Sequence, residues 1–207
     1  MHTSGVERLV FAILIAALAA GGCRRREQPS PGSEGPAGSP NPAQTTPKSR
    51  ADWRQRVRWP DECENAFSQT SGGENGSGVR TYSLPDRKQL LEVRCARGAY
   101  QPSQVFAVVA PDAVAGTLLT FPVATVADNG TAEWDHAQEV WGSATFDAAT
   151  ARLTMVNQAR GLGDCGTAVV YELGMAGRSE VGVVSARAKP CDDNAQPPDV
   201  WPVIPHP

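Results

Sequence analysis

The sequence lacks the marks of several large protein classes. Its 19 Lys and Arg residues are outnumbered by 22 Asp and Glu residues, the formal net charge is −3, and the basic residues are dispersed, so we expect no nucleic-acid partner. No Cys-x-x-Cys pair occurs, which disfavours a zinc site built from thiolates. The uncharged apolar run Leu9–Gly22 is shorter than the roughly 20 residues that a membrane-spanning helix needs. This run therefore needs a different explanation.

The apolar run has the length of a signal-peptide core and ends in small residues, as a signal-peptidase site does. Ala20–Cys23 resembles the bacterial lipobox, whose cysteine receives a diacylglycerol. The resemblance implies a signal peptide over residues 1–22 and a membrane anchor through a lipid on Cys23. Leu18 lies two positions earlier than the lipobox leucine, and the arginines at 24–26 oppose translocation. An ordinary signal peptide cut slightly earlier, or a short uncleaved anchor, therefore stays open. The residue after the cysteine is not Asp, which favours the outer membrane, facing the periplasm.

The segment after the cysteine contains almost nothing that could be buried. Pro, Gly, Ser and Thr dominate Glu27–Arg50, so we expect residues 23–50 to form a disordered tether behind the lipid. Its prolines give it a semi-extended reach on the order of 30–50 Å. The remainder, residues 51–207, is long enough for a single domain with a sizeable core.

Four cysteines lie in this domain, and an even count in an exported chain predicts two disulfides with three alternative connectivities. They are Cys63, Cys95, Cys165 and Cys191. A weak internal symmetry favours one connectivity: Tyr82–Leu84 and Tyr171–Leu173 each open a hairpin that runs towards a cysteine, and each has another cysteine upstream. We therefore pair Cys63 with Cys95 and Cys165 with Cys191, each bridge stabilising the domain by roughly 3–4 kcal/mol.

The residue pattern of the domain is mainly that of β-strands. Ala51–Gln69 is the only helical candidate, with Pro60 at a position typical of a first helical residue. From residue 79 onward, apolar residues recur with period two, so that Leu91, Val93 and Cys95 share one face. The predicted strands are 79–84, 89–95, 104–110, 117–123, 140–146, 152–157, 167–173 and 180–188. We predict an all-β fold, mainly an antiparallel sandwich or an open barrel of short strands, with one short N-terminal helix and two disulfides.

The stretch RGLGDCGTA contains a Gly-x-Gly-x-x-Gly pattern at Gly161, Gly163 and Gly166. A dinucleotide-binding loop of this pattern must open a helix, because the helix N-terminus supplies the N–H groups that hold the pyrophosphate. The residues that follow, TAVVYEL, are β-branched and alternating, which predicts a strand at this position. We therefore expect no nucleotide site, and interpret the glycines as permitting a sharp connection that a disulfide holds.

The same stretch carries a family resemblance. Arg160–Gly166, RGLGDCG, resembles a signature of the bacterial envelope proteins grouped as domain of unknown function 1176, and Cys95–Tyr100 resembles that family's Cys-x-x-Gly-Ala-Tyr. Gln101 stands where the family usually has Asn, and the closing Trp201-Pro202 also fits. The resemblance spans roughly Trp59–Pro202 and would correspond to the C-terminal part of longer members. It implies an exported, disulfide-bearing β domain, and it brings no activity and no catalytic residues.

Few residues are candidates for chemistry. A Ser-His-Asp arrangement would need His136 to be supported by a carboxylate, and Asp135 cannot supply it if the two residues alternate on a strand. We therefore expect no catalytic residues and a domain that is not an enzyme, with a small hydrolase as the less favoured alternative. Trp134, beside Asp135 and His136 in a predicted loop, is the candidate for ligand contact.

An acidic cluster surrounds the predicted turn at Asn129-Gly130. Carboxylates of one loop can hold Ca²⁺, but their spacing does not match an EF-hand, and a solvated hairpin tip is the favoured interpretation. The cluster consists of Asp128, Glu133, Asp135 and Glu139. We assign no metal and no cofactor.

Taken with the anchor and tether, these features predict an exported bacterial lipoprotein whose non-catalytic β domain has an unknown molecular role in the cell envelope. Its expected partners are the membrane, through the lipid, and an envelope protein or glycan. The alternative is a periplasmic inhibitor or glycan-binding module that acts on cell-wall enzymes.

The lipid anchor is testable without a structure. In cells treated with globomycin, which blocks lipoprotein signal peptidase, the unprocessed precursor should accumulate, and in untreated cells the mature N-terminus should carry diacylglycerol on Cys23. Mass spectrometry of the purified chain measures both, with Cys23→Ala as the unlipidated control. An unmodified mature N-terminus in untreated cells would contradict the anchor.

Overall fold

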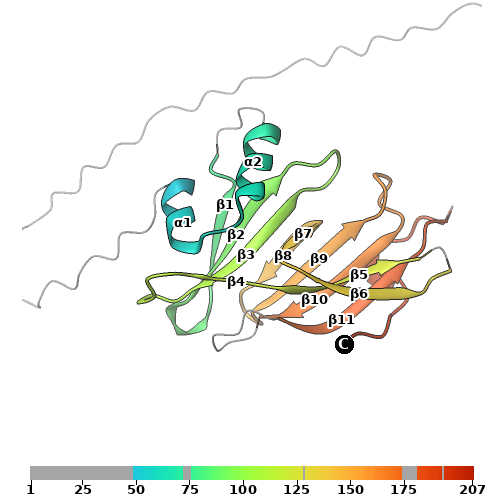
Figure 1. Ribbon diagram of the computed structural model, residues 1–207. Helices are drawn as coiled ribbons and strands as arrows, with labels where there is room; N and C mark the ends of the chain where they lie inside the picture. Colours follow the sequence, from blue (N-terminus) through green and yellow to red (C-terminus); the bar gives the residue numbers. More distant parts are fainter. Residues whose placement is uncertain (1–48, 72–75, 128, 174–180, 193) are drawn as a thin grey trace, which may run out of the picture. The chain divides into compact units, whose positions relative to one another are not determined.

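The computed structural model describes residues 49–71, 76–127, 129–173, 181–192 and 194–207, all within one unit, Thr45–Pro207 (Figure 1). The predicted signal peptide, Cys23 and most of the predicted tether lie outside the described residues. The helices of the described part are α1 (Arg50–Val57), α2 (Asp61–Thr70), and the 3-10 turns η1 (Pro85–Arg87) and η2 (Pro198–Val200). Its strands are β1 (Val79–Ser83), β2 (Gln89–Ala96), β3 (Ser103–Val109), β4 (Thr117–Leu118), β5 (Phe121–Val126), β6 (Ala132–Ala137), β7 (Glu139–Trp141), β8 (Ser143–Asp147), β9 (Arg152–Gln158), β10 (Gly166–Glu172) and β11 (Gly182–Lys189).

The single helix predicted over 51–69 is wrong, because the chain forms two helices there. Arg58 adopts a left-handed conformation with φ 58° and ends α1, and Pro60 disfavours a helical conformation at Trp59. Pro60 is the cap before α2 and not its first residue. A capping box at Ser49 fixes the start of α1, since Ser49 and Asp52 each accept the other's backbone N–H. Among the described helices, none combines the length and apolar character that a bilayer span requires.

The helices cover one face of an antiparallel sheet with the order β1-β2-β3-β4, to which β7 adds by pairing with β3. As predicted, Leu91, Val93 and Cys95 share the covered face, where they pack with Trp53 and Trp59 of the helical segment. The disulfide between Cys63 and Cys95 ties α2 to β2 across this interface, as the sequence symmetry predicted. The core between the helices and the first sheet is therefore small and apolar, and it is crossed by a disulfide.

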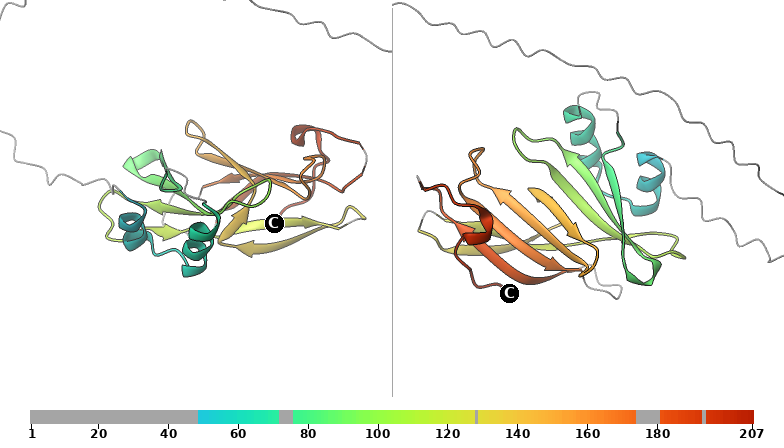
Figure 2. Two further views of the ribbon diagram at one scale, coloured as in Figure 1. Left: turned by 90° about the horizontal axis from the view of Figure 1, so that it is seen from above. Right: turned by 180° about the vertical axis from the view of Figure 1, so that it is seen from behind.

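A second antiparallel sheet has the order β11-β10-β9-β8. The β5–β6 hairpin lies across one face of this sheet, in front of it in Figure 1 and behind it in the reverse view of Figure 2, and β5 contacts β10 and β11. Three aromatic rings fill the main core: Phe121 packs edge-on against both Phe106 and Tyr171, at centroid distances of 5.5 and 5.1 Å. The Cys165–Cys191 disulfide, also as predicted, joins the start of β10 to the residues after β11.

The predicted class, an antiparallel all-β domain with two disulfides, is confirmed, but two predicted strands are divided. Segment 117–123 forms β4 and then β5, which leaves the first sheet to pair with β6. Segment 140–146 forms β7 in the first sheet and β8 in the second. The chain passes between the two sheets at Gly142, whose φ is 131°. A Cβ at this position would lie 2.4 Å from the Val156 carbonyl oxygen.

Gly142 should therefore tolerate no side chain. We expect Gly142→Ala to lower the free energy of unfolding by about 2–4 kcal/mol, because it combines an unfavourable φ with a backbone clash. Gly182→Ala is the matched control, since a Cβ there meets no atom within 4 Å, and it should change stability by less than about 1 kcal/mol. Urea unfolding followed by circular dichroism measures both, and equal midpoints for the two variants would contradict the role of Gly142.

Candidate functional site

The two sequence motifs that carry the family resemblance lie against each other, although some 60 residues separate them. Gln101 joins them, because its Nε2 donates hydrogen bonds to Asn157 Oδ1 (2.7 Å) and to the Gln158 carbonyl oxygen (3.2 Å). Its Oε1 accepts the Gln158 backbone N–H at 2.9 Å. The Tyr100 hydroxyl donates to the Ala159 carbonyl oxygen at 3.4 Å. One amide side chain therefore fixes the 97–102 loop to the end of β9.

Large apolar side chains are exposed where these loops meet. Leu162 is 80% exposed, Tyr100 is 51% exposed and Trp141 is 46% exposed. Two glycines bring the rings close to the backbone: a Cβ at Gly98 would lie 2.9 Å from the Trp141 ring, and one at Gly161 would lie 3.4 Å from the Tyr100 ring. We call Tyr100, Gln101, Trp141, Asn157 and Leu162 the aromatic face. Exposed apolar groups gathered in this way are typical of a binding surface.

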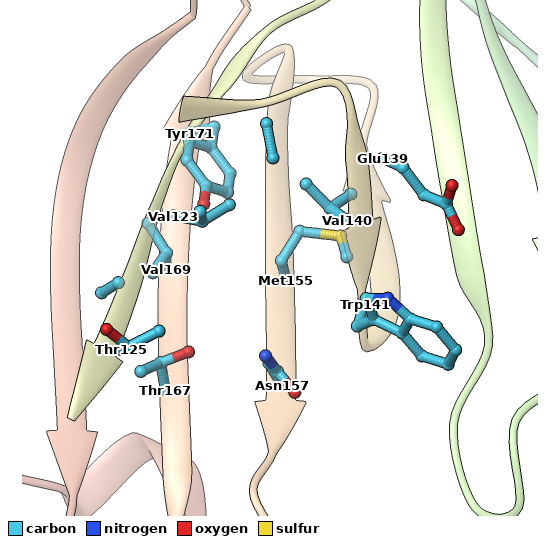
Figure 3. A pocket seen from close by; sticks show the side chains of 12 residues that line it. Val123, Thr125, Glu139, Val140, Trp141, Met155, Asn157, Thr167, Val169 and Tyr171 are labelled. Carbon is cyan, nitrogen blue, oxygen red and sulfur yellow. The ribbon is translucent and has the colours of Figure 1, made fainter. Parts of the chain in front are cut away.

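A cleft of about 130 Å³ lies beside Trp141, between β5 and the strands β9 and β10 (Figure 3). Its apolar wall includes Val140, Met155 and Val169, and its polar side chains include Thr125, Thr167 and Asn157. A second hollow of about 300 Å³ shares Thr125, Asn157 and Thr167 with it and extends to Lys189 and Cys191. Because they share these lining residues the two hollows adjoin, and we call them together the groove. Trp141 and Asn157 of the aromatic face line its first hollow.

Tyr171 lines this groove but is not suited to acid–base chemistry. Its hydroxyl donates to the Pro122 carbonyl oxygen at 2.7 Å, and the side chain is 2% exposed. Burial raises the pKa of Tyr171 far above its ordinary value, so the phenol stays neutral at physiological pH. Its role in the groove is to link β10 to the β5–β6 hairpin.

The glycine-rich corner has the role expected from the sequence. Gly166 begins β10 with φ 136°, and a Cβ there would lie 2.0 Å from the Asn157 carbonyl oxygen. Arg160 closes the corner by pairing with Asp164, with Nε 2.9 Å from Oδ1, and by donating to the Asp192 carbonyl oxygen at 2.7 Å. A strand follows Gly166, so the corner presents no helix N-terminus to a phosphate.

A family model described as "Protein of unknown function (DUF1176)" matches residues 15–205 of the 207-residue chain. The chain belongs to this family. The DUF1176 match begins well before Trp59, so the span of Trp59–Pro202 expected from the motifs was too narrow at its N-terminal end. Searches of the curated proteins and of the solved structures each found no match.

In this DUF1176 protein, Trp134, Asp135 and His136 lie on strand β6 and not in the predicted loop. The Trp134 ring is half-buried against the main core, and its Nε1–H donates to the Pro205 carbonyl oxygen at 3.0 Å. Asp135 accepts the backbone N–H of His136 at 2.7 Å. Because neighbouring residues of a strand point to opposite faces, Asp135 does not support the His136 ring. Their contact with a ligand stays a prediction.

The acidic residues near the β5–β6 turn do not gather into a metal centre within the part of the chain that the structure describes. Asp128 lies outside that part, while Glu133 and Asp135 are exposed on β6 and Glu139 begins β7. No group of three or more His, Cys, Asp or Glu side chains in the described ranges is placed to hold a metal ion.

The sequence reasoning missed the aromatic face. Trp141 lies in an alternating apolar segment, a pattern typical of a core or edge residue, but it is half-exposed at the end of β7, next to Gly142 where the chain passes between the sheets. The exposure of Leu162 could have been predicted from the sequence, since a large apolar residue between two glycines in a turn has no strand neighbours to bury it. The approach of Tyr100 to Gly161 could not be predicted from either of the two sequence motifs alone, because it depends on how distant segments pack.

The ion pair at the corner should make stability depend on pH. The hydrogen bonds from Arg160 lower the pKa of Asp164 from 3.8 to about 2, so the folded state binds this proton less readily than the unfolded state. The resulting stabilisation is present above the unfolded pKa of 3.8 and is lost as the pH falls towards about 2. We expect the melting temperature of the wild type to exceed that of Asp164→Asn at neutral pH, and the difference to shrink across this acidic range.

Arg160→Gln is the matched control, because it removes the cause of the pKa shift and leaves the carboxyl group. It should lose the same pH-dependent part of the stability. Melting temperatures recorded by circular dichroism from neutral pH to about pH 2 measure this, and a difference that stays constant with pH would contradict the assignment.

Proposed function

We propose that this protein is an exported lipoprotein of the bacterial cell envelope, and that its β domain is a non-catalytic binding module. The lipid on Cys23 anchors it, in the outer membrane and facing the periplasm, and residues 23–50 act as the tether. The signal-peptide pattern and the lipobox resemblance support this placement. The two disulfides add support, because such bridges persist in oxidising compartments.

The aromatic face is the binding surface in this proposal, and its composition is the observation that carries it. Tyr100, Trp141 and Leu162 expose apolar groups without filling a core, and they lie where the two family motifs meet. Aromatic rings supply much contact area at a small cost in conformational entropy, which is why they dominate binding surfaces. The neighbouring groups are amides and hydroxyls, which select a partner by hydrogen bonding. The module binds an envelope protein or a glycan.

A glycan is the second candidate for the ligand. This corresponds to the alternative function, a glycan-binding module that acts on cell-wall enzymes. The observation that favours it is the combination of an exposed indole with the Asn157 amide and the groove hydroxyls of Thr125 and Thr167. A pyranose ring has an apolar C–H face that stacks on an indole and hydroxyl groups that pair with amides. The groove beside Trp141 would then accommodate one or two sugar units.

Substitutions on the aromatic face test the binding function. Trp141→Ala and Leu162→Asp should each weaken capture of the partner from envelope extract by at least about tenfold, because loss of a central apolar anchor costs about 2 kcal/mol or more. Val114→Asp is the matched control, since Val114 is 96% exposed in the β3–β4 connection, away from this face. Quantitative pull-down with the full-length chain in neutral detergent measures capture.

Competition by neutral cell-wall oligosaccharides in the same assay separates a glycan from a protein partner. Equal loss of capture in Val114→Asp and Trp141→Ala, or unchanged capture in both Trp141→Ala and Leu162→Asp, would contradict the proposed surface.

A further inference from the structure

A polar cleft of about 600 Å³ lies apart from the aromatic face, between the first sheet and β8. Its lining includes charged residues of both signs from β1 and β2, a buried amide from β3 and a hydroxyl from β8. We call these residues the polar cleft: Arg80, Glu92, Arg94, Gln104 and Ser143. Its volume is within the range of small-molecule sites, roughly 300–1,000 Å³.

Glu92 is the unusual residue of the polar cleft, because it is a carboxylate that is only 6% exposed. The Tyr82 hydroxyl donates to its Oε2 at 2.6 Å, and Arg80 Nη1 lies 3.5 Å from its Oε1. The Arg80 side chain is 69% exposed, so its guanidinium is a loosely held partner at the mouth of the cleft. Removing a carboxylate from water is costly unless its oxygens are bonded, and among the residues that the structure describes Oε1 has only this long contact.

The wall of the cleft continues along β2. Arg94, two residues beyond Glu92, also lines the cleft, and its guanidinium carbon lies 5.6 Å from the centroid of the Phe67 ring. Opposite Arg94 in the strand register, Gln104 is 2% exposed and is held by its hydrogen bond to the Gly142 carbonyl oxygen at 3.0 Å. The cleft thus has a rigid polar wall on which the Glu92 carboxylate lies beside the exposed Arg80 guanidinium.

The charges define the ligand class. An anion alone would face Glu92 at short range, and a cation alone would face the Arg80 guanidinium. A ligand that carries both signs satisfies the cleft, and the 3.5 Å spacing of Glu92 and Arg80 is similar to the separation of the ammonium and carboxylate groups in an α-amino acid.

We propose that the polar cleft binds a zwitterionic α-amino acid, whose ammonium group contacts Glu92 and whose carboxylate group contacts Arg80. Ser143 lines the cleft from the second sheet. This site shares no residue with the aromatic face, so it stands or falls independently of the proposed function.

Calorimetric titration of the full-length chain in neutral detergent with L-alanine tests the proposal. Binding should be measurable, and replacing L-alanine by N-acetyl-L-alanine or by L-alaninamide should each weaken it by at least about tenfold, as expected for loss of one charge-assisted contact. Glu92→Gln should weaken binding of L-alanine to a similar extent. Glu172→Gln, an exposed glutamate of β10, is the matched control and should bind as the wild type does.

A second pair of variants guards against a folding defect at the buried Glu92. Ser143→Phe fills the cleft from the second sheet without altering the ion pair and should abolish binding, whereas Ser185→Phe on β11 should not. Thermal unfolding verifies that each variant is folded. The proposal is overturned if acetate binds as tightly as L-alanine, if folded Ser143→Phe binds L-alanine normally, or if L-alanine does not bind to the wild type.

Discussion

The close approach of two strands at Gly166 is the constraint on which the candidate site depends. A side chain there would collide with the Asn157 carbonyl oxygen, so only glycine lets β10 begin directly beside the end of β9. The Cys165–Cys191 disulfide and the Arg160–Asp164 ion pair hold this corner from the other side. Asn157 is thereby placed to accept the hydrogen bond from Gln101, and this bond positions the loop that carries Tyr100. The exposed rings are thus positioned by backbone packing several residues away from them.

The sequence predicted those parts of the fold that arise from local pattern or from cysteine chemistry. Alternation located most strands, and the placing of Leu91, Val93 and Cys95 on one face was correct because a strand fixes that geometry by itself. Both disulfide pairings were predicted from the repeated arrangement of the cysteines around hairpins. The strand–turn interpretation of RGLGDCGTA was also right, because β-branched residues after the glycines exclude a helix start there.

Tertiary packing decided what the sequence did not predict. Strand β6 carries Glu133 and Asp135 on its solvent face, which made it resemble a loop, and it is a strand because β5 pairs with it along its whole length. The break between α1 and α2 follows from the left-handed Arg58 before Pro60. Tyr100, Trp141 and Leu162 come together only through contacts between distant segments, which no local pattern records. The same holds for the polar cleft, whose wall and roof belong to different sheets.

The Gln104 side chain lies between the polar cleft and the groove beside Trp141. The Gln104 amide, which lines the polar cleft, also lies 3.7 Å from the sulfur of Met155, and Met155 lines the groove beside Trp141. The hydrogen bond from Gln104 to the Gly142 carbonyl oxygen ties this shared wall to the passage between the sheets. Two hollows of different polarity are therefore separated by the thickness of a few side chains in one rigid core.

The last residues of the chain pack against the second sheet and bond to it. Trp201 is fully buried, the backbone N–H of Ile204 donates to the Ala186 carbonyl oxygen, and the Pro205 carbonyl oxygen receives the indole N–H of Trp134. A protease cut ahead of Trp201 would strip the outer layer from β11 and leave an indole donor without its acceptor. Shortened versions of the protein intended for crystallisation should consequently be trimmed from the front, with the proline-rich tail after Trp201 kept whole.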